Sequence, residues 1–265
     1  IEESLMSIPV LFFAYLIVEY ISSQNALNKI MEFGKVGPFI GAILGSIPQC
    51  GFSVVAARLY AMRYLTMGTL LSIFMATSDE ALAILIAHPD LWGMMIILIV
   101  LKIVIGTVTG IVVDGFHHKG KEDYEYLQVE SCDCGCQESI WMPAIRHTIT
   151  TFIFILLTNI VFTYLVAVIG EDNLTNILKT NWLLQPIIAG IVGFIPNCAG
   201  SVILTQLYVA GGLSFGALVT GLTTSAGVGT LALIRYNEDK KDTAKVLLTS
   251  YFVALVIGYI IVILF

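Results

Sequence analysis

The sequence predicts an all-α integral membrane protein built from two inverted repeats. Hydrophobic residues make up 57% of its 265 residues and charged residues only 12%, whereas a soluble domain carries about 25% charged residues. Long apolar stretches fill both halves of the chain, and one short motif occurs in each half. The formal net charge of −6 argues against nucleic acid as a partner, because nucleic-acid binders need a basic surface. The lipid bilayer is therefore the expected environment.

Eight apolar stretches approach or exceed the roughly 20 residues that a membrane-spanning helix needs. They cover Leu5–Ile21, Val36–Ala61, Thr66–His88, Leu91–Val113, Ala144–Ile169, Trp182–Ala210, Ser214–Arg235 and Ala244–Phe265. The first stretch lacks a basic segment before it and a small-residue cleavage site after it, which favours a span over a signal peptide. We therefore expect a membrane repeat over 1–113, a polar loop over 114–142 and a second membrane repeat over 143–265.

A motif centred on Pro-x-Cys supports the duplication. Gly45-Ser-Ile-Pro-Gln-Cys-Gly-Phe-Ser53 aligns with Gly193-Phe-Ile-Pro-Asn-Cys-Ala-Gly-Ser201 at an offset of 148 residues without a gap. Apolar residues match by chance between membrane segments, but this combination of proline, cysteine, glycine and serine does not. The pattern predicts that the second half of the chain repeats the fold of the first.

The basic residues indicate how the repeats lie in the membrane. If 36–61 and 182–210 each crossed the bilayer, these residues would fall on both faces. If each stretch is instead a re-entrant helical hairpin, eleven of the thirteen basic residues share one face, as expected for a cytoplasmic side. Those eleven are Lys29, Lys35, Arg58, Arg63, Lys119, Lys121, Arg146, Arg235, Lys240, Lys241 and Lys245.

The re-entrant interpretation predicts three spans plus one hairpin in each half, and ten helical segments in all. An odd number of crossings inverts the second half relative to the first, so both termini are expected outside and the central loop in the cytoplasm. Inverted repeats with broken helices are typical of secondary transporters.

Polar residues at the two hairpin tips are the first candidates for a substrate site. The first tip carries Gln49, Cys50 and Ser53, and the second carries Asn197, Cys198 and Ser201. Amide, carbonyl and thiol groups at matched depth could bind a substrate together. Alternatively, the amides and hydroxyls satisfy backbone groups released by the prolines, and the cysteines act as small apolar fillers.

Two acids inside an apolar stretch carry the strongest functional signal. Asp79 and Glu80 follow Thr77 and Ser78 within Thr66–His88. Burying a carboxylate costs several kcal/mol unless it is neutralised or paired. On a continuous helix Ser72, Ala76, Asp79 and Ala83 share one face, which would direct Asp79 into the bundle. Lys102, in the middle of a span, is the expected charge partner, in a salt bridge that is either structural or part of a site for substrate or coupling protons.

The second repeat replaces these acids by Gly227 and Val228. We expect the small residues to allow close approach of the opposite hairpin tip, with Thr224 and Ser225 as oxygen donors. Ordinary helix packing explains the pattern equally well. Carboxylate, amide and carbonyl oxygens suit Mn²⁺, while added thiols shift the preference toward softer metals.

Two further features of the sequence each allow two interpretations. The central loop contains His117, His118, Cys132, Cys134 and Cys136, which are candidates for accessory metal capture in the cytoplasm, or else part of a solvated acidic linker. The Gly-x-x-x-Gly motifs at 41–45, 106–110 and 212–216 favour packing within the chain, with homodimerisation as the less favoured alternative.

The residues from Gly37 to Ser53, together with Thr77-Ser-Asp-Glu80 and Pro196-Asn-Cys-Ala199, resemble a bacterial family of ten-helix heavy-metal exporters. Its members are also labelled arsenic efflux proteins or manganese transporters. The resemblance covers nearly the whole chain, and counting each hairpin as two helices gives the family's ten. It implies outward transport of a metal or metalloid across the bacterial cytoplasmic membrane.

We therefore expect a secondary transporter that exports a divalent metal cation such as Mn²⁺, with no cofactor apart from the transported ion and no enzymatic activity. A transporter of an arsenical or another anion, paired with Lys102, is the first alternative. A membrane enzyme using the cysteines and carboxylates is the second, and the inverted repeat argues against it because catalysis does not require one.

Overall fold

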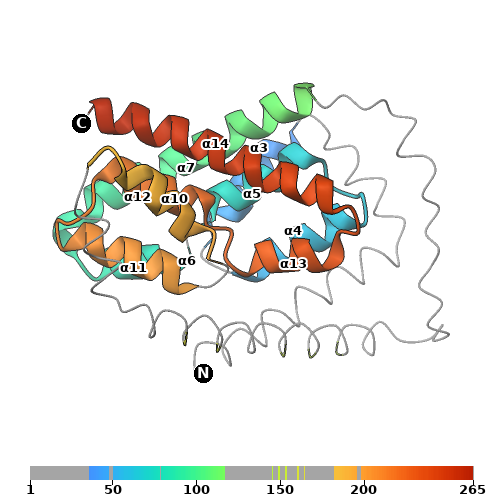
Figure 1. Ribbon diagram of the computed structural model, residues 1–265, viewed down its shortest axis with the longest axis horizontal. Helices are drawn as coiled ribbons and strands as arrows, with labels where there is room; N and C mark the ends of the chain where they lie inside the picture. The colour runs from blue at the N-terminus through green and yellow to red at the C-terminus, as the bar shows by residue number, and fades with distance from the viewer. Residues whose placement is uncertain are drawn as a thin grey trace.

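A computed structural model describes residues 36–47, 50–77, 79–116, 182–195 and 198–264, together with five single residues between 145 and 164. The predicted span Leu5–Ile21, nearly all of Ala144–Ile169 and the loop from 117 onward lie outside the described residues. Within the described residues every regular element is a helix, in agreement with the expected class (Figure 1).

The helices of the two halves follow the same order and have nearly the same lengths. The first half contains α3 (Gly37–Gly45), α4 (Cys50–Ala61), α5 (Met67–Ala76), α6 (Asp79–Ile86), a short 3-10 helix (Pro89–Leu91) and α7 (Trp92–Phe116). The second half contains α10 (Gln185–Gly193), α11 (Cys198–Val209), α12 (Phe215–Thr224), α13 (Val228–Tyr236) and α14 (Lys240–Leu264). Apart from α6 and α13, each pair of counterparts begins and ends 148 residues apart, which is the offset found in the sequence.

Local sequence explains several of these boundaries. Thr66 and Ser214 are the N-caps of α5 and α12, and their side chains accept hydrogen bonds from the backbone N–H groups of Thr69 and Ala217. Helices α3 and α10 each carry a proline in the first turn, where its missing N–H costs nothing. Both predicted hairpin stretches are interrupted near their Pro-x-Cys motifs, since α3 ends at Gly45 and α10 at Gly193.

The prediction of a continuous helix over 66–88 is wrong. Helix α5 ends at Ala76, and Thr77 has an extended backbone with ψ of 131°. The corresponding stretch 214–235 is likewise interrupted after Thr224, and Gly227 has a positive φ of 50°. Threonine hydroxyls that bond to the preceding turn compete with helix continuation, and the Thr77 hydroxyl donates to the Ile73 carbonyl at 2.8 Å. Asp79 therefore begins a new helix, and the face predicted to include Ser72, Ala76, Asp79 and Ala83 does not exist.

Smaller differences concern helix ends. Helix α7 continues to Phe116, three residues past the predicted end of its span, and α14 begins at Lys240 rather than Ala244. Charged and polar residues can extend a helix beyond its apolar part because they lie where the helix leaves the bilayer.

The two halves interlock in the interior. Helix α5 packs against α3 and α7, and α12 packs against α10 and α14. Across the halves, α4 lies beside α13 and α6 beside α11, as Figure 1 shows. Glycines permit the closest approaches: a Cβ on Gly45 would meet the Ile73 carbonyl, and a Cβ on Gly193 would meet the Gly221 carbonyl. All four glycines of the motifs at 41–45 and 106–110 lie against α5, so these motifs are used for packing within the chain.

Three apolar segments among the described residues are long enough to cross a membrane: Pro89–Phe116, Phe215–Tyr236 and Lys240–Leu264. Their burial differs sharply, because 89% of the apolar window in Phe215–Tyr236 is buried but only 28% of that in Lys240–Leu264. Hydrophobic side chains such as Val104 and Phe252 are exposed on α7 and α14. The broken segment therefore lies inside the bundle, and α7 and α14 present apolar faces suited to lipid.

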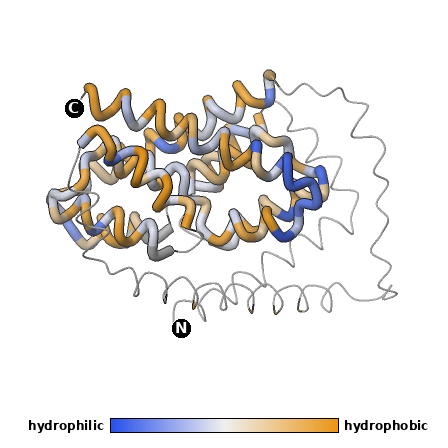
Figure 2. Tube along the Cα trace, in the orientation of Figure 1, coloured by the Kyte–Doolittle hydropathy of each residue, from blue (hydrophilic) through white to orange (hydrophobic). Residues whose placement is uncertain are grey.

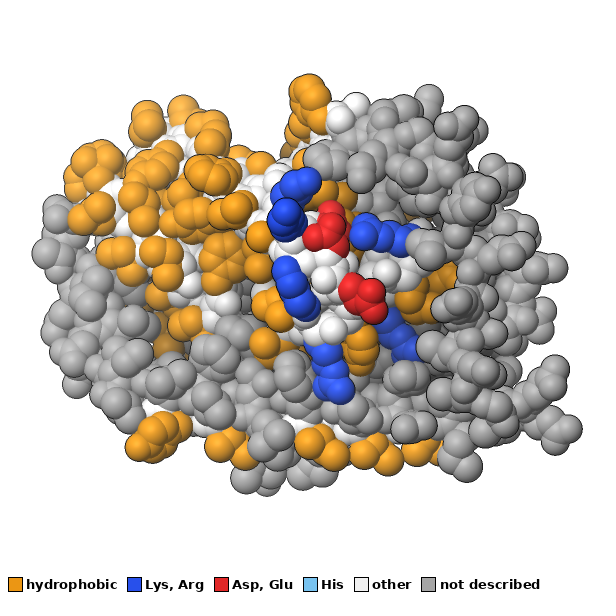
Figure 3. All heavy atoms as spheres, turned by 45° about the vertical axis from the view of Figure 1, so that its right-hand side comes forward, with side chains coloured by type: hydrophobic (Ala, Val, Ile, Leu, Met, Phe, Trp, Pro, Cys, Tyr) orange, Lys and Arg blue, Asp and Glu red, His pale blue; other side chains and the backbone are white. Residues whose placement is uncertain are grey.

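Hydrophilic residues gather at one end of the molecule, where α4 and α13 finish and α14 begins (Figure 2). Figure 3 shows Lys and Arg mixed with Asp and Glu at this end, beside a hydrophobic surface. Except for Lys102, the described basic residues belong to these segments: Arg58, Arg63, Arg235, Lys240, Lys241 and Lys245. The expected clustering of basic residues therefore holds for this part of the chain.

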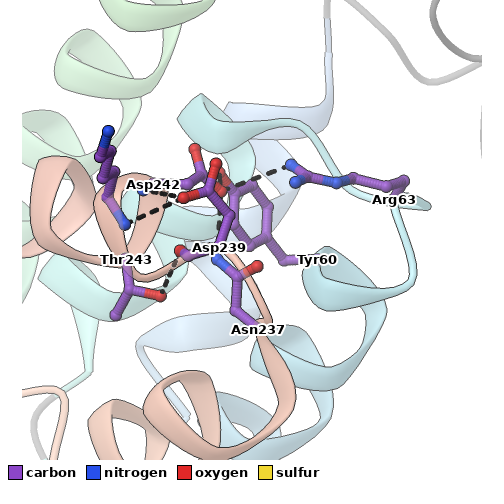
Figure 4. Close-up of polar contacts among 7 residues, drawn as sticks. Tyr60, Arg63, Asn237, Asp239, Asp242 and Thr243 are labelled. Atoms are coloured by element: carbon purple, nitrogen blue, oxygen red, sulfur yellow. Dashed lines mark hydrogen bonds and ion pairs between the residues drawn. The ribbon is translucent and has the colours of Figure 1, made fainter.

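Asp242 ties the halves together at this charged end (Figure 4). Its carboxylate accepts hydrogen bonds from the Tyr60 hydroxyl at 2.7 Å, from Asn237 Nδ2 at 3.1 Å and from Arg63 Nη1 at 3.4 Å. These contacts connect the end of α4 with the junction of α13 and α14.

Candidate functional site

Lys102 marks the place where the two broken segments meet. Its side chain comes from the middle of α7 and is fully buried, with 0% exposure. The ammonium group donates one hydrogen bond to the Thr77 carbonyl and another, of 2.8 Å, to the Leu222 carbonyl. Thr77 is the C-cap of α5, and Leu222 lies in the last turn of α12. One cation thus binds the carboxyl-terminal ends of two helices from different halves.

The electrostatics of this arrangement are favourable. The last carbonyl groups of a helix lack partners within the helix and carry the negative end of its dipole. A buried ammonium group is costly unless it is paired or hydrogen-bonded. The Lys102 ammonium group supplies hydrogen-bond donors to the carbonyl groups at the ends of α5 and α12, and these carbonyl groups in turn stabilise its buried charge.

Two of the predicted hydroxyl residues meet beside this point. Ser53 Oγ on α4 lies 3.3 Å from Thr77 Oγ1, and both side chains are buried. Because the Thr77 hydroxyl donates to the Ile73 carbonyl, it can accept a hydrogen bond from Ser53. A Cβ on Gly229 of α13 would overlap Ser53, so the first turns of α4 and α13 touch. The sequence predicted a close approach at Gly227 and Val228, and the contact with Ser53 lies at the next residue, Gly229.

Two adjacent threonines differ in their partners. The Thr224 hydroxyl lies within hydrogen-bond distance of the carbonyls of Gly190 (3.0 Å), Gly221 (2.9 Å) and Thr220 (3.2 Å), so its proton is engaged by the backbone. Thr223 Oγ1 is buried and has no hydrogen-bond partner. An unpaired buried hydroxyl costs about 1–3 kcal/mol, which is unusual unless the group serves another purpose.

The sequence predicted Thr224 and Ser225 as oxygen donors and did not single out Thr223. Both selected residues are buried, but the contacts of Thr224 are those of a packing residue. The three residues are neighbours in one polar run, and nothing in that run distinguishes one hydroxyl from the next. Only the contacts with α10 separate them.

The acid motif begins close to Lys102 along the chain. Asp79 and Glu80 are the first two residues of α6, and Asp79 stands two residues after Thr77, whose carbonyl binds Lys102. Cys50 and Cys198 occupy equivalent places as the first residues of α4 and α11. Ser201, in the first turn of α11, is buried.

Several predicted residues lie outside the described part of the chain. They are Gln49, Ser78, Asn197, His117, His118, Cys132, Cys134 and Cys136, together with the side chains of Cys50, Asp79, Glu80 and Cys198. Among the residues that the structure describes, no three His, Cys, Asp or Glu side chains gather as metal ligands. The described polar groups at the breaks are hydroxyls and carbonyls, which are ligands for hard cations.

Comparison with known proteins gives one result. A family model described as "Putative, 10TM heavy-metal exporter" matches residues 4–167 and 147–264, which together cover nearly the whole chain. No curated protein and no solved structure matches it. The family description agrees with the all-helical fold and with the membrane-length apolar helices. The chain therefore belongs to the 10TM heavy-metal exporter family.

Proposed function

We propose that this protein is a secondary transporter that exports a divalent metal cation, Mn²⁺ or a similar heavy metal, across the cytoplasmic membrane. The observation that carries the proposal is the meeting of the α5 and α12 carbonyl ends at a buried cation, Lys102. In membrane transporters, helix ends that stop inside the bilayer coordinate cations through such carbonyls. Membership of a heavy-metal exporter family supports the same function.

The proposal includes two inverted repeats with re-entrant hairpins. Gly37 and Gly45 of α3 lie against Thr69 and Ile73 of α5, so the two helices run in parallel from the charged end toward the interior. Helix α4 runs back, since its first turn contacts the break at Thr77 and its last turn reaches the charged end. These contacts support a hairpin that enters and leaves at the charged end.

The second hairpin is proposed to enter from the opposite end. Gln185, the first residue of α10, binds the Gly212 carbonyl at 3.3 Å and the Ser214 N–H at 3.0 Å, beside the start of α12. Helix α11 ends at Val209, only three residues before Gly212. Both ends of this hairpin therefore lie at the start of α12, while the ends of the first hairpin lie at the start of α5.

In this scheme Asp79 and Glu80 are the primary metal ligands or proton carriers. Gln49, Cys50, Asn197 and Cys198 complete the site from the two tips. The charged end faces the cytoplasm, in keeping with its basic residues, so both termini are external and the central loop is cytoplasmic. The sequence contains no nucleotide-binding loop, which favours coupling to protons or to the substrate gradient.

The surroundings of Lys102 favour a cation over an arsenical or another anion. An anion site would leave the ammonium available to the substrate, but here two carbonyl oxygens accept hydrogen bonds from it. The nearby helix ends are the negative ends of their dipoles, which repel an anion and attract a cation. The anion alternative therefore receives less support from the geometry.

Flux measurements in proteoliposomes test this function. We expect transport of Mn²⁺ or another divalent metal but not of arsenite, and a loss of at least about tenfold in Asp79→Asn and in Glu80→Gln, because one charge pair near a protein interior is worth a few kcal/mol. Glu238→Gln removes an acid between α13 and α14 and should leave flux unchanged. Unaltered metal flux in both site variants, or arsenite transport alone, would contradict the proposal.

A further inference from the structure

We propose that the ammonium group of Lys102 competes with the transported metal for the carbonyl oxygens at the ends of α5 and α12. The metal-free binding site then reorients across the membrane only when Lys102 binds these oxygens. This inference rests on the proposed function and specifies how its site is regulated. It predicts that the lysine controls whether the protein performs net export or only exchanges one metal ion for another.

The oxygens that Lys102 binds belong to interrupted helices. Thr77 caps α5 with an extended backbone, and Leu222 is two residues from the end of α12. The Ala226 N–H, which would reach the Leu222 carbonyl if α12 continued, instead donates to the Thr224 carbonyl at 3.1 Å. The Leu222 oxygen therefore depends on a donor from outside its helix, and Lys102 provides it at 2.8 Å.

The charges explain why metal and lysine exclude each other. A divalent ion bound at these carbonyls would repel the ammonium group, since both are positive and Lys102 is fully buried. Removing the metal leaves the negative ends of two helix dipoles inside an apolar membrane. An ammonium group returning to the carbonyls offsets that negative potential, so that the site can cross the bilayer without a bound ion.

The second repeat shows that the scaffold does not require this lysine. The position in α14 equivalent to Lys102 is Ser250, which is also buried. Helix α14 packs against α12 much as α7 packs against α5, with a serine at this place. A buried lysine in only one of two equivalent helices is costly to keep for packing alone, which favours a role in the transport cycle.

The test compares net efflux with exchange of radioactive Mn²⁺ in proteoliposomes. Lys102→Gln removes the charge but keeps an amide donor for the carbonyls, and Lys102→Met removes both. We expect both variants to bind Mn²⁺ at least tenfold more tightly, to lose at least tenfold in net efflux, and to keep Mn²⁺–Mn²⁺ exchange within twofold of the wild-type rate. Lys102→Arg, which keeps the charge, and Ser250→Ala, the matched control in the second repeat, should retain net efflux.

The outcomes separate this inference from the function on which it rests. If Lys102→Gln showed net efflux at the wild-type rate, the inference would be overturned but the proposed transport function would still stand. Weaker Mn²⁺ binding with loss of both transport modes would also overturn it, because that result describes a structural lysine. In Lys102→Gln, Mn²⁺ in the opposite compartment should accelerate efflux at least threefold, because exchange does not need the empty site to return, and no acceleration would overturn the inference. Absence of wild-type metal transport in either mode would refute the proposed function itself.

Discussion

The segments α3–α7 and α10–α14 have helices of matching length and order, but the two segments differ in charge. Most of their helices begin and end at matching positions, and glycines at Gly45 and Gly193 make the same close contact with the neighbouring helix. The break in the first half leads into Asp79 and Glu80, whereas the break in the second leads through Gly227 into Val228. Among the described residues, close glycine packing therefore occurs in both segments, whereas a buried lysine occurs in only one of them.

The starts of α5 and α12 show the same contrast at the two ends of the molecule. At the charged end, the Asp114 carboxylate accepts hydrogen bonds from the Thr66 hydroxyl at 2.7 Å and from the Gly68 N–H at 2.8 Å. At the start of α12, the neutral amide of Gln185 performs the corresponding function for Ser214. A carboxylate is favoured at a helix amino terminus, and near the basic cluster it is favoured further.

The largest expected effect concerns the packing that the halves share. Gly45→Ala and Gly193→Ala each place a Cβ against a backbone carbonyl, which side-chain movement cannot relieve. We expect each change to lower the free energy of unfolding by about 3 kcal/mol, measured by thermal unfolding in detergent. Gly93→Ala and Gly115→Ala meet no atom within 4 Å and should not destabilise the protein. If only one of Gly45→Ala and Gly193→Ala lowered the stability, the two halves would be packed differently at these glycines.

A smaller effect separates the two threonines that end α12. Thr224→Val removes the hydrogen bond to the Gly190 carbonyl and should lower the free energy of unfolding by about 1 kcal/mol. Thr223→Val removes a buried hydroxyl that has no partner, so stability should stay equal or rise. Melting temperatures of the two variants provide the measurement. The reverse order would assign the packing role to Thr223 and not to Thr224.

The smallest effect is expected at Asp239, which precedes α14, where the first half has Leu91 at the equivalent place. The backbone N–H of Asp242, and then that of Lys241, donate to its carboxylate and hold the pKa of Asp239 below its usual value. A lowered pKa in the folded state stabilises the protein above the unfolded pKa of about 4, and this contribution disappears as the pH falls through the folded value.

Melting temperatures between pH 7 and pH 3 test that dependence. The fall in melting temperature on acidification should be slightly shallower in Asp239→Asn than in the wild type, because asparagine caps the helix without titrating. Because the group is fully exposed, the difference is small. An identical pH profile for the two proteins would show that the carboxylate does not contribute to stability in this range.

Sequence patterns were sufficient for the membrane class and for the ends of α7 and α14 within a few residues, and the offset of 148 residues recurs in the described helix boundaries. They were sufficient because hydropathy reflects transfer into the bilayer, and each residue contributes to it independently of its partners. The same patterns led to Lys102, since a lysine within an apolar span is conspicuous wherever its partners lie. The clustering of basic residues at one end was expected for the same reason.

The interior of the site was decided by the tertiary structure. Hydropathy carries no information about the backbone at Thr77 or at Ser225–Gly227, so both breaks were missed within apolar stretches. The partners of Lys102 lie 25 and 120 residues away along the chain, and the packing of α7 against the ends of α5 and α12 brings them together. Composition and spacing determined that a charge is buried, but which oxygens receive it depends on contacts that exist only once both halves have folded together.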